Sequence, residues 1–145
     1  MAFYFSLATV LRVRQIIEER EASLLRRILC EIEKTIDLIN KSDVEGVRAN
    51  ASRRTDVLKS FRGSAIHAAY GEVEAVKLKK QEYKATLERL EELRDKQLIV
   101  YRTARRNREV LADMQIEKRC AYNSQITRHE QSTIDDNYAA RRARS

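Results

Sequence analysis

Proline and tryptophan are absent from this sequence, and only three of its 145 residues are glycine. Proline and glycine mark most turns, so their scarcity predicts a chain that rarely reverses direction. Charged residues make up 35% of the chain, which is typical of long helices and coiled coils when alanine, leucine and glutamine are also abundant. The sequence therefore predicts an all-α protein held together by a narrow apolar seam rather than by a thick core.

Motifs for nucleotides, metals and disulfides are also missing. Neither GxxxxGK[ST] nor GxGxxG occurs, so the chain lacks both glycine-rich phosphate-binding loops. His67 and His129 stand far apart in the sequence, which argues against a shared metal ion. Cys30 and Cys120 are too few for a disulfide scaffold, and we expect two free thiols.

The charged clusters do not point to catalysis. An acidic group near the C-terminus consists of Glu130, Asp135 and Asp136. We expect it on a solvated helix face, because a two-helix protein offers no cleft for acid–base work. We therefore predict no enzyme activity, no cofactor, no metal site and no small-molecule ligand.

The net charge of +7 favours acidic partners in general and does not identify one. Arginines cluster between residues 102 and 108, and a basic helix can lie along DNA phosphates. Acidic residues are nevertheless interleaved with basic ones through most of the chain, as in residues 88–95. We expect no nucleic acid as the partner, and a basic nucleic-acid-binding protein remains an alternative.

The opening MAFYFSLATVLRVR is apolar and then turns basic. No basic residue precedes the apolar run, Ser6 and Thr9 interrupt it, and it stops at Arg12, so neither a secretory signal nor a membrane span is expected. Its apolar residues fall mostly three and four apart, which predicts one edge of an amphipathic helix. We expect a cytoplasmic protein.

The second half of the chain follows a seven-residue repeat, in which seam residues recur at alternating spacings of three and four. The predicted seam is Val73, Val76, Lys80, Tyr83, Leu87, Leu90, Arg94, Gln97, Tyr101, Ala104, Arg108, Leu111, Gln115, Lys118 and Tyr122. Its polar members have long stems that can lie along a seam. This pattern predicts a coiled-coil helix.

The first half shows two neighbouring repeats instead of one. The first is Leu7, Val10, Arg14, Ile17, Glu21, Leu24 and Ile28, and the second is Leu25, Leu29, Ile32, Ile36 and Ile39. We interpret the shift as a stripe that migrates round the helix where a partner helix wraps it.

All three glycines lie mid-chain, and they locate the expected turn. Gly46 suggests a local helix break, whereas Gly63 and Gly71 stand closer together. A turn over residues 62–72 leaves two arms of similar length, about 3–61 and 73–138, followed by a basic frayed tail at 139–145. We predict a single domain over 1–145, a long antiparallel two-helix coiled-coil hairpin.

Both ends of the chain resemble the flagellar export protein FliJ family. The opening Phe3-x-Phe5-x-Leu7-x-x-Val10-Leu11-Arg12-x-Arg14, followed by Glu18-Glu19, is similar to that family's N-terminal pattern. Arg128-x-Glu130-Gln131-x-x-x-Asp135-Asp136 is similar to its acidic C-terminal pattern, and the seam from Tyr83 to Leu111 fits its coiled-coil body.

The resemblance implies a non-catalytic component of the type III flagellar export apparatus, active in flagellum biogenesis and motility. Family members form an antiparallel two-helix coiled coil similar to the stalk of rotary ATPases. The implied partners are the hexameric export ATPase, the export gate membrane protein and export chaperones. The implied location is the cytoplasmic face of the flagellar basal body.

Two binding regions follow from this interpretation. At the ATPase end, Phe3, Phe5 and Leu7 would pack on the C-terminal helix near Ile126, Ile134 and Tyr138. At the hairpin tip, the candidates are Phe61, Ile66 and Tyr70, either as a patch for the gate or a chaperone or as residues that close the turn. The competing interpretation is a homodimeric coiled-coil tether.

Overall fold

A computed structural model of the chain describes residues 3–59 and 62–144. These residues form two α-helices, α1 from Ala8–Lys59 and α2 from Gly63–Ala143, and no strand. The helices pack against each other, which confirms the predicted all-α two-helix hairpin. Their packing divides the chain into two compact units: unit 1 is Met1–Arg20 with Arg102–Ser145, and unit 2 is Glu21–Tyr101.

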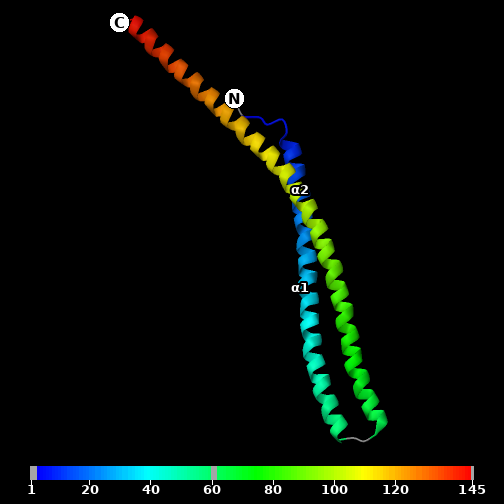
Figure 1. Ribbon diagram of the computed structural model, residues 1–145. Helices are drawn as coiled ribbons and strands as arrows, with labels where there is room; N and C mark the ends of the chain where they lie inside the picture. Colours follow the sequence, from blue (N-terminus) through cyan, green and yellow to red (C-terminus); the bar gives the residue numbers. More distant parts are fainter. Residues whose placement is uncertain (1–2, 60–61, 145) are drawn as a thin grey trace. The chain divides into compact units, whose positions relative to one another are not determined.

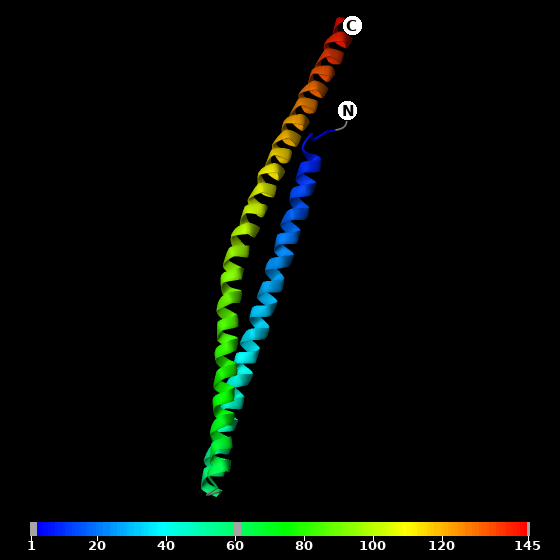
Figure 2. The same ribbon diagram turned by 90° about the vertical axis from the view of Figure 1, so that its right-hand side faces the viewer.

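In unit 2, α1 and α2 lie side by side and run in opposite directions (Figure 1, Figure 2). Asp43 forms an ion pair with Lys80. The amide of Gln97 donates hydrogen bonds of 2.6 Å to the Glu21 carboxylate and 3.2 Å to its backbone oxygen. Residue numbers rise along one helix as they fall along the other, so these contacts define an antiparallel register.

The seam of unit 2 is a continuous seven-residue repeat on both helices, and all its members are buried or half-buried. On α1 these are Glu21, Leu25, Ile28, Ile32, Thr35, Ile39, Ser42, Gly46, Ala49 and Arg53. On α2 they are Ile66, Ala69, Val73, Val76, Lys80, Tyr83, Leu87, Leu90, Arg94, Gln97 and Tyr101. We label seam positions a and d; positions g and c then lie on one side of the seam and e and b on the other.

Unit 1 continues the same repeat on each helix. Its seam consists of Leu11, Arg14 and Glu18 from α1, and of Ala104, Arg108, Leu111, Gln115, Lys118 and Tyr122 from α2. Arg108 donates hydrogen bonds of 2.7 Å and 3.3 Å to the two carboxylate oxygens of Glu18. The rings of Phe3 and Tyr122 lie 5.6 Å apart between centroids. Within unit 1, the pairing is therefore also antiparallel.

After Tyr122, every described residue of α2 is exposed. Tyr122 already lies opposite Phe3, and the repeat becomes polar beyond it, with Gln125 and His129 at the next seam positions. Both views show this end of α2, coloured orange to red, extending past the start of α1 (Figure 1, Figure 2). The helix reaches Ala143, so the prediction that the tail frays from residue 139 is wrong.

The predicted turn over 62–72 is also wrong, because α2 begins at Gly63 and runs through Gly71 without interruption. The backbone oxygen of Arg62 accepts the first hydrogen bonds of α2, from Ala65 and Ile66. No described glycine has a positive φ, so the glycines do not reverse the chain. Arg53 contacts Tyr70 across the hairpin. The midpoint of this pair in the sequence falls between the end of α1 at Lys59 and the start of α2 at Gly63.

The predicted helix break near Gly46 does not occur either, because α1 is continuous to Lys59. Gly46 occupies an a position, and a Cβ atom there would lie 3.7 Å from Cγ1 of Val76. The small seam residues Ser42, Gly46 and Ala49 let the two helices approach closely. Gly46 therefore serves packing rather than chain reversal.

Candidate protein-binding surfaces

The predicted N-terminal site residues do not form an exposed surface. Phe5 is buried, and Phe3 and Leu7 are half-buried. The Lys118 ammonium lies 5.6 Å from the centre of the Phe5 ring, and Phe3 packs on Tyr122. The opening of the chain therefore closes the end of the seam in unit 1, which limits its capacity to contact a partner.

The remaining predicted residues of this region lie elsewhere on α2. Ile134 and Tyr138 are about two-thirds exposed, and the antiparallel register pairs Phe3 with Tyr122 instead. The prediction that the N-terminal aromatics also pack near Ile134 and Tyr138 is wrong, because it placed the turn too late and shifted the register; Phe3 packs on Tyr122, one helical turn before Ile126. Ile126 lies with Tyr122 and His129 along a surface hollow of about 430 Å³.

The predicted tip residues are only partly described. Phe61 lies outside the described residues. Ile66 is a half-buried seam residue, and Tyr70 is about half exposed. The Arg53 guanidinium lies 5.0 Å from the centre of the Tyr70 ring, an attractive cation–π contact between α1 and α2. Ile66 and Tyr70 thus help to close the hairpin and leave part of the tyrosine accessible.

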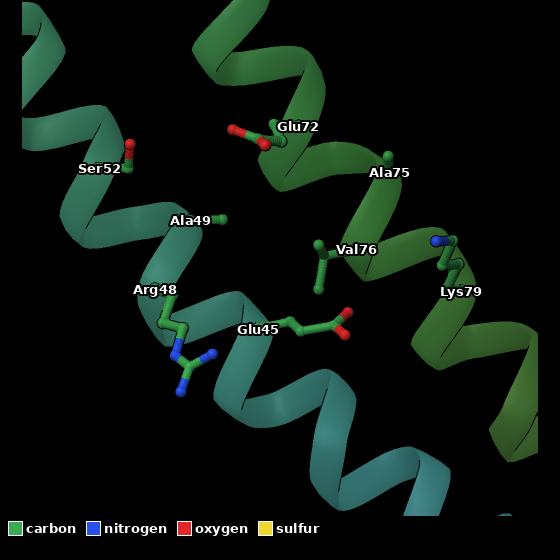
Figure 3. A pocket seen from close by; sticks show the side chains of 8 residues that line it. All are labelled: Glu45, Arg48, Ala49, Ser52, Glu72, Ala75, Val76 and Lys79. Atoms are coloured by element: carbon green, nitrogen blue, oxygen red, sulfur yellow. The ribbon is translucent and has the colours of Figure 1, made fainter.

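Two sides of the seam can be distinguished in unit 2. A hollow of about 400 Å³ is lined by the g residues Glu45, Ser52, Glu72 and Lys79 from both helices. Figure 3 shows Glu45 and Val76 pointing into the space between the helices, whereas Arg48, at a c position, projects outward. We call this side the g edge. A second hollow, lined by Asp43, Asn50 and Lys77, lies on the opposite side, the e edge.

Unit 1 carries an exposed apolar cluster on its g edge. Its members are Val10, Val13, Val110 and Met114, which are 43%, 49%, 53% and 37% exposed. The Phe3–Tyr122 and Glu18–Arg108 contacts bracket this stretch of both helices. Sequence reasoning missed the cluster, because it assigned Val10 to the seam and gave Val13, Val110 and Met114 no role.

Charged residues are used differently along the chain. Arg108 of the arginine cluster donates hydrogen bonds to Glu18. Arg105 donates a 2.8 Å hydrogen bond to Glu109, which lowers the pKa of this exposed carboxyl.

Cys30 and Cys120 are free, exposed thiols, as predicted. No group of three potential metal ligands occurs in residues 3–59 and 62–144. Over the same residues, neither helix contains a segment apolar and long enough to cross a membrane.

Comparison with protein-family models, curated protein sequences and solved structures finds no match to this chain.

Proposed function

We propose that this chain is a non-catalytic, stalk-like component of the flagellar type III protein export apparatus. In this proposal it promotes assembly and activity of the hexameric export ATPase and links that ring to the export gate and to chaperones. It would act in the cytoplasm, at the cytoplasmic face of the basal body. The support is the resemblance of both chain ends to the FliJ family, together with the two-helix coiled-coil hairpin of the chain.

The observation that carries the proposal is the apolar cluster of unit 1. The seam is filled by the chain's own two helices, so Val10, Val13, Val110 and Met114 are not needed to close it. Exposed apolar residues gathered on one edge are typical of a protein-binding surface. This also favours the hairpin over the homodimeric tether, whose seam would require a second chain.

Symmetry supplies the mechanism. A single helix pair inside a six-subunit ring cannot present the same edge to all six subunits. It can therefore favour one conformation at some ATPase sites over others. If it binds the assembled ring better than free subunits, it also stabilises the ring by linkage.

The test is stimulation of a purified flagellar export ATPase by this chain. Val13→Asp with Val110→Asp should abolish most of the stimulation, because burying a charge at an apolar interface is costly. The matched control is Val44→Asp, at an f position of unit 2 with similar exposure, 52%. Circular dichroism should show equal helicity in all variants. Stimulation that survives in the folded double variant, or that is never observed, contradicts the proposal.

A further inference from the structure

The g edge of unit 2 carries apolar side chains where two-stranded coiled coils usually carry charged ones. Leu24 and Leu38 of α1 are 36% and 40% exposed, and Leu93 and Val100 of α2 are 50% and 47% exposed. The Glu21–Gln97 contact places Leu24 at the level of Leu93 and Val100. Leu38 follows two repeats further along α1, about 21 Å away at ~1.5 Å per residue. These residues form a strip along one edge.

Basic residues line both sides of this strip. The c positions of α1 in unit 2 are basic at four successive repeats, Arg27, Lys34, Lys41 and Arg48, and all four are exposed. On α2, Arg89 and Lys96 occupy the c positions beside Leu93 and Val100, and both are exposed.

Four acidic residues also lie on this edge. Glu31 accepts a 2.8 Å hydrogen bond from Lys34, which raises the pKa of that lysine and offsets part of its positive charge. Nearer the tip, Glu45 and Glu72 lie at g positions and Glu82 lies at a c position. Around Leu24, Leu93 and Val100, the rim therefore remains positively charged.

The opposite e edge differs in charge but not in apolar exposure. Leu29 and Ile36 of α1 are 41% and 42% exposed there. Their charged neighbours at e and b positions are mixed in sign and include Arg26, Glu33, Lys84, Glu88, Glu91 and Asp95. The positive rim is thus specific to the g edge and is not a consequence of the chain's net charge.

We propose that the g edge of unit 2 binds an acidic amphipathic helix of a partner protein, which packs as a third helix. Its apolar stripe would cover Leu24, Leu93 and Val100, and its Glu and Asp residues would face Arg27, Lys34, Arg89 and Lys96. An edge between two paired helices can hold a third helix that presents apolar anchors at i, i+3, i+4 and i+7. This inference does not depend on the flagellar assignment and concerns a different unit from the ATPase test.

Charge disfavours a second copy of this chain as the occupant, because covering Leu24, Leu93 and Val100 with the same region of another copy would bring basic residues together. The apolar side chains are half covered by the helix pair and include no aromatic residue. Peripheral membrane helices instead project large apolar and aromatic side chains beyond their charges. A nucleic acid would leave the apolar strip without a partner. An acidic amphipathic helix would cover the apolar strip and pair its carboxylates with the basic residues beside it.

The experiment titrates the full chain against a labelled synthetic helix of about three heptads, with Leu at a and d and Glu at the flanking positions. A second probe carries Lys in place of Glu. Fluorescence anisotropy should show saturable binding of the Glu probe, weakened as NaCl is raised, and little binding of the Lys probe. Salt weakens exposed ion pairs because the screening length falls to about 3 Å at 1 M.

Matched variants locate the binding site. Leu24→Gln and Leu93→Gln should each weaken binding roughly three- to eightfold, since about a third of Leu24 and half of Leu93 remain to be buried. Leu29→Gln and Ile36→Gln on the e edge should leave binding unchanged. Likewise Arg27→Glu should weaken binding of the Glu probe, whereas Arg26→Glu on the other edge should not.

Several results would overturn the proposal. These are no saturable binding of the Glu probe, equal binding of both probes, or equal effects of the g-edge and e-edge variants. Light scattering that shows a dimer lost in Leu24→Gln would identify a second copy as the occupant. Sedimentation with vesicles containing anionic phosphatidylglycerol, if lost in Leu24→Gln while the Glu probe fails to bind, would identify a membrane surface.

Discussion

The ion pair between Glu18 and Arg108 tests whether polar seam residues hold unit 1 together. The Arg108 guanidinium bonds both carboxylate oxygens of Glu18, at 2.7 Å and 3.3 Å, and the two side chains are 28% and 16% exposed. Arg108→Met keeps a long apolar stem in the seam but removes the cation. Glu18 then retains its charge in a mostly covered position without this partner.

The expected cost follows from that geometry. A hydrogen bond to a charged group is worth about 1.5–3 kcal/mol, and breaking a fully buried pair costs about 3–5 kcal/mol. Because the pair keeps some contact with solvent, we expect Arg108→Met to lower the free energy of unfolding by about 1.5–3 kcal/mol. At about 2–4 °C per kcal/mol for a chain of this size, Tm should fall by roughly 3–12 °C.

Glu18→Met with Arg108→Met should recover most of that loss. The double variant leaves no uncompensated charge and adds apolar surface to the seam, so its stability should lie within about 1 kcal/mol of the parent or above it. Urea and thermal unfolding followed by circular dichroism would complete the double-mutant cycle. The coupling energy should be on the order of 1–3 kcal/mol.

Arg105→Met is the matched control. Arg105 bonds Glu109 at 2.8 Å, a similar distance, but these side chains are 55% and 45% exposed. An exposed pair contributes little to stability, because water screens its charges and its side chains lose freedom on pairing. Two results would show that burial in the seam does not strengthen the Glu18–Arg108 pair. One is an Arg108→Met variant no less stable than Arg105→Met, and the other is a double-mutant cycle without coupling.

Other expectations follow from the same structure. Gly71→Ala should raise stability by about 0.5–1 kcal/mol in thermal unfolding, because a Cβ there meets nothing within 4 Å and alanine favours helix. Gly46→Leu should lower it by about 1–3 kcal/mol, since atoms beyond the Cβ would crowd Val76; equal stability of Gly46→Leu and Gly46→Ala would contradict this. Phe5→Ser should cost about 2–4 kcal/mol and speed hydrogen exchange in unit 1, because it empties a buried aromatic site. Light scattering should show a monomer, and a stable dimer would count against the self-contained seam. Tyr70→Ser should lose the contact with Arg53, worth about 0.5–1 kcal/mol; loss of export-gate binding with little change in Tm would assign this tyrosine to the gate, and unaltered binding would remove it.

The seam of α2 could be predicted closely from sequence. Fourteen of the fifteen positions from Val73 to Tyr122 are buried or half-buried, and the remaining one, Lys118, lies over the Phe5 ring. The spacing predicts these positions well because long polar side chains can lie along a seam with their methylene stems.

The seam of α1 was split into two repeats because short polar residues conceal its continuity. Thr35 and Ser42 are buried, and each hydroxyl donates a hydrogen bond to the backbone oxygen four residues earlier, at 2.8 Å and 2.9 Å. Such a hydroxyl needs no partner on the facing helix, so it tolerates a seam position. Hydropathy alone selected Ile36 and Leu24, which are partly exposed flanking residues.

The turn was misplaced for a related reason. The prediction assigns chain reversal to Gly63 and Gly71, yet Gly63 begins α2, Gly71 lies inside it, and neither has a positive φ. A glycine within a helix costs only about 1 kcal/mol relative to alanine, so two glycines over a long helix do not force a turn. An error of a few residues in the turn then shifted every expected contact across the hairpin, including those of Phe3 and Phe5.

The binding surfaces were the hardest feature to predict, because they consist of exposed apolar residues beside the seam, which are recognised only once the seam residues are known. Val10 and Leu24 fit a helical stripe in the sequence, and only the register shows that they lie at g positions beside the seam. The two g edges also differ in chemistry. In unit 1, the exposed valines Val13 and Val110 occupy c positions. In unit 2, the corresponding c positions carry basic residues such as Arg27 and Lys96. A partner of unit 1 should therefore bind with little dependence on salt, whereas a partner of unit 2 should weaken as salt rises. Titrations of the intact chain at low and high NaCl would separate the two surfaces, and equal salt dependence of both interactions would show that the rim charges do not govern recognition.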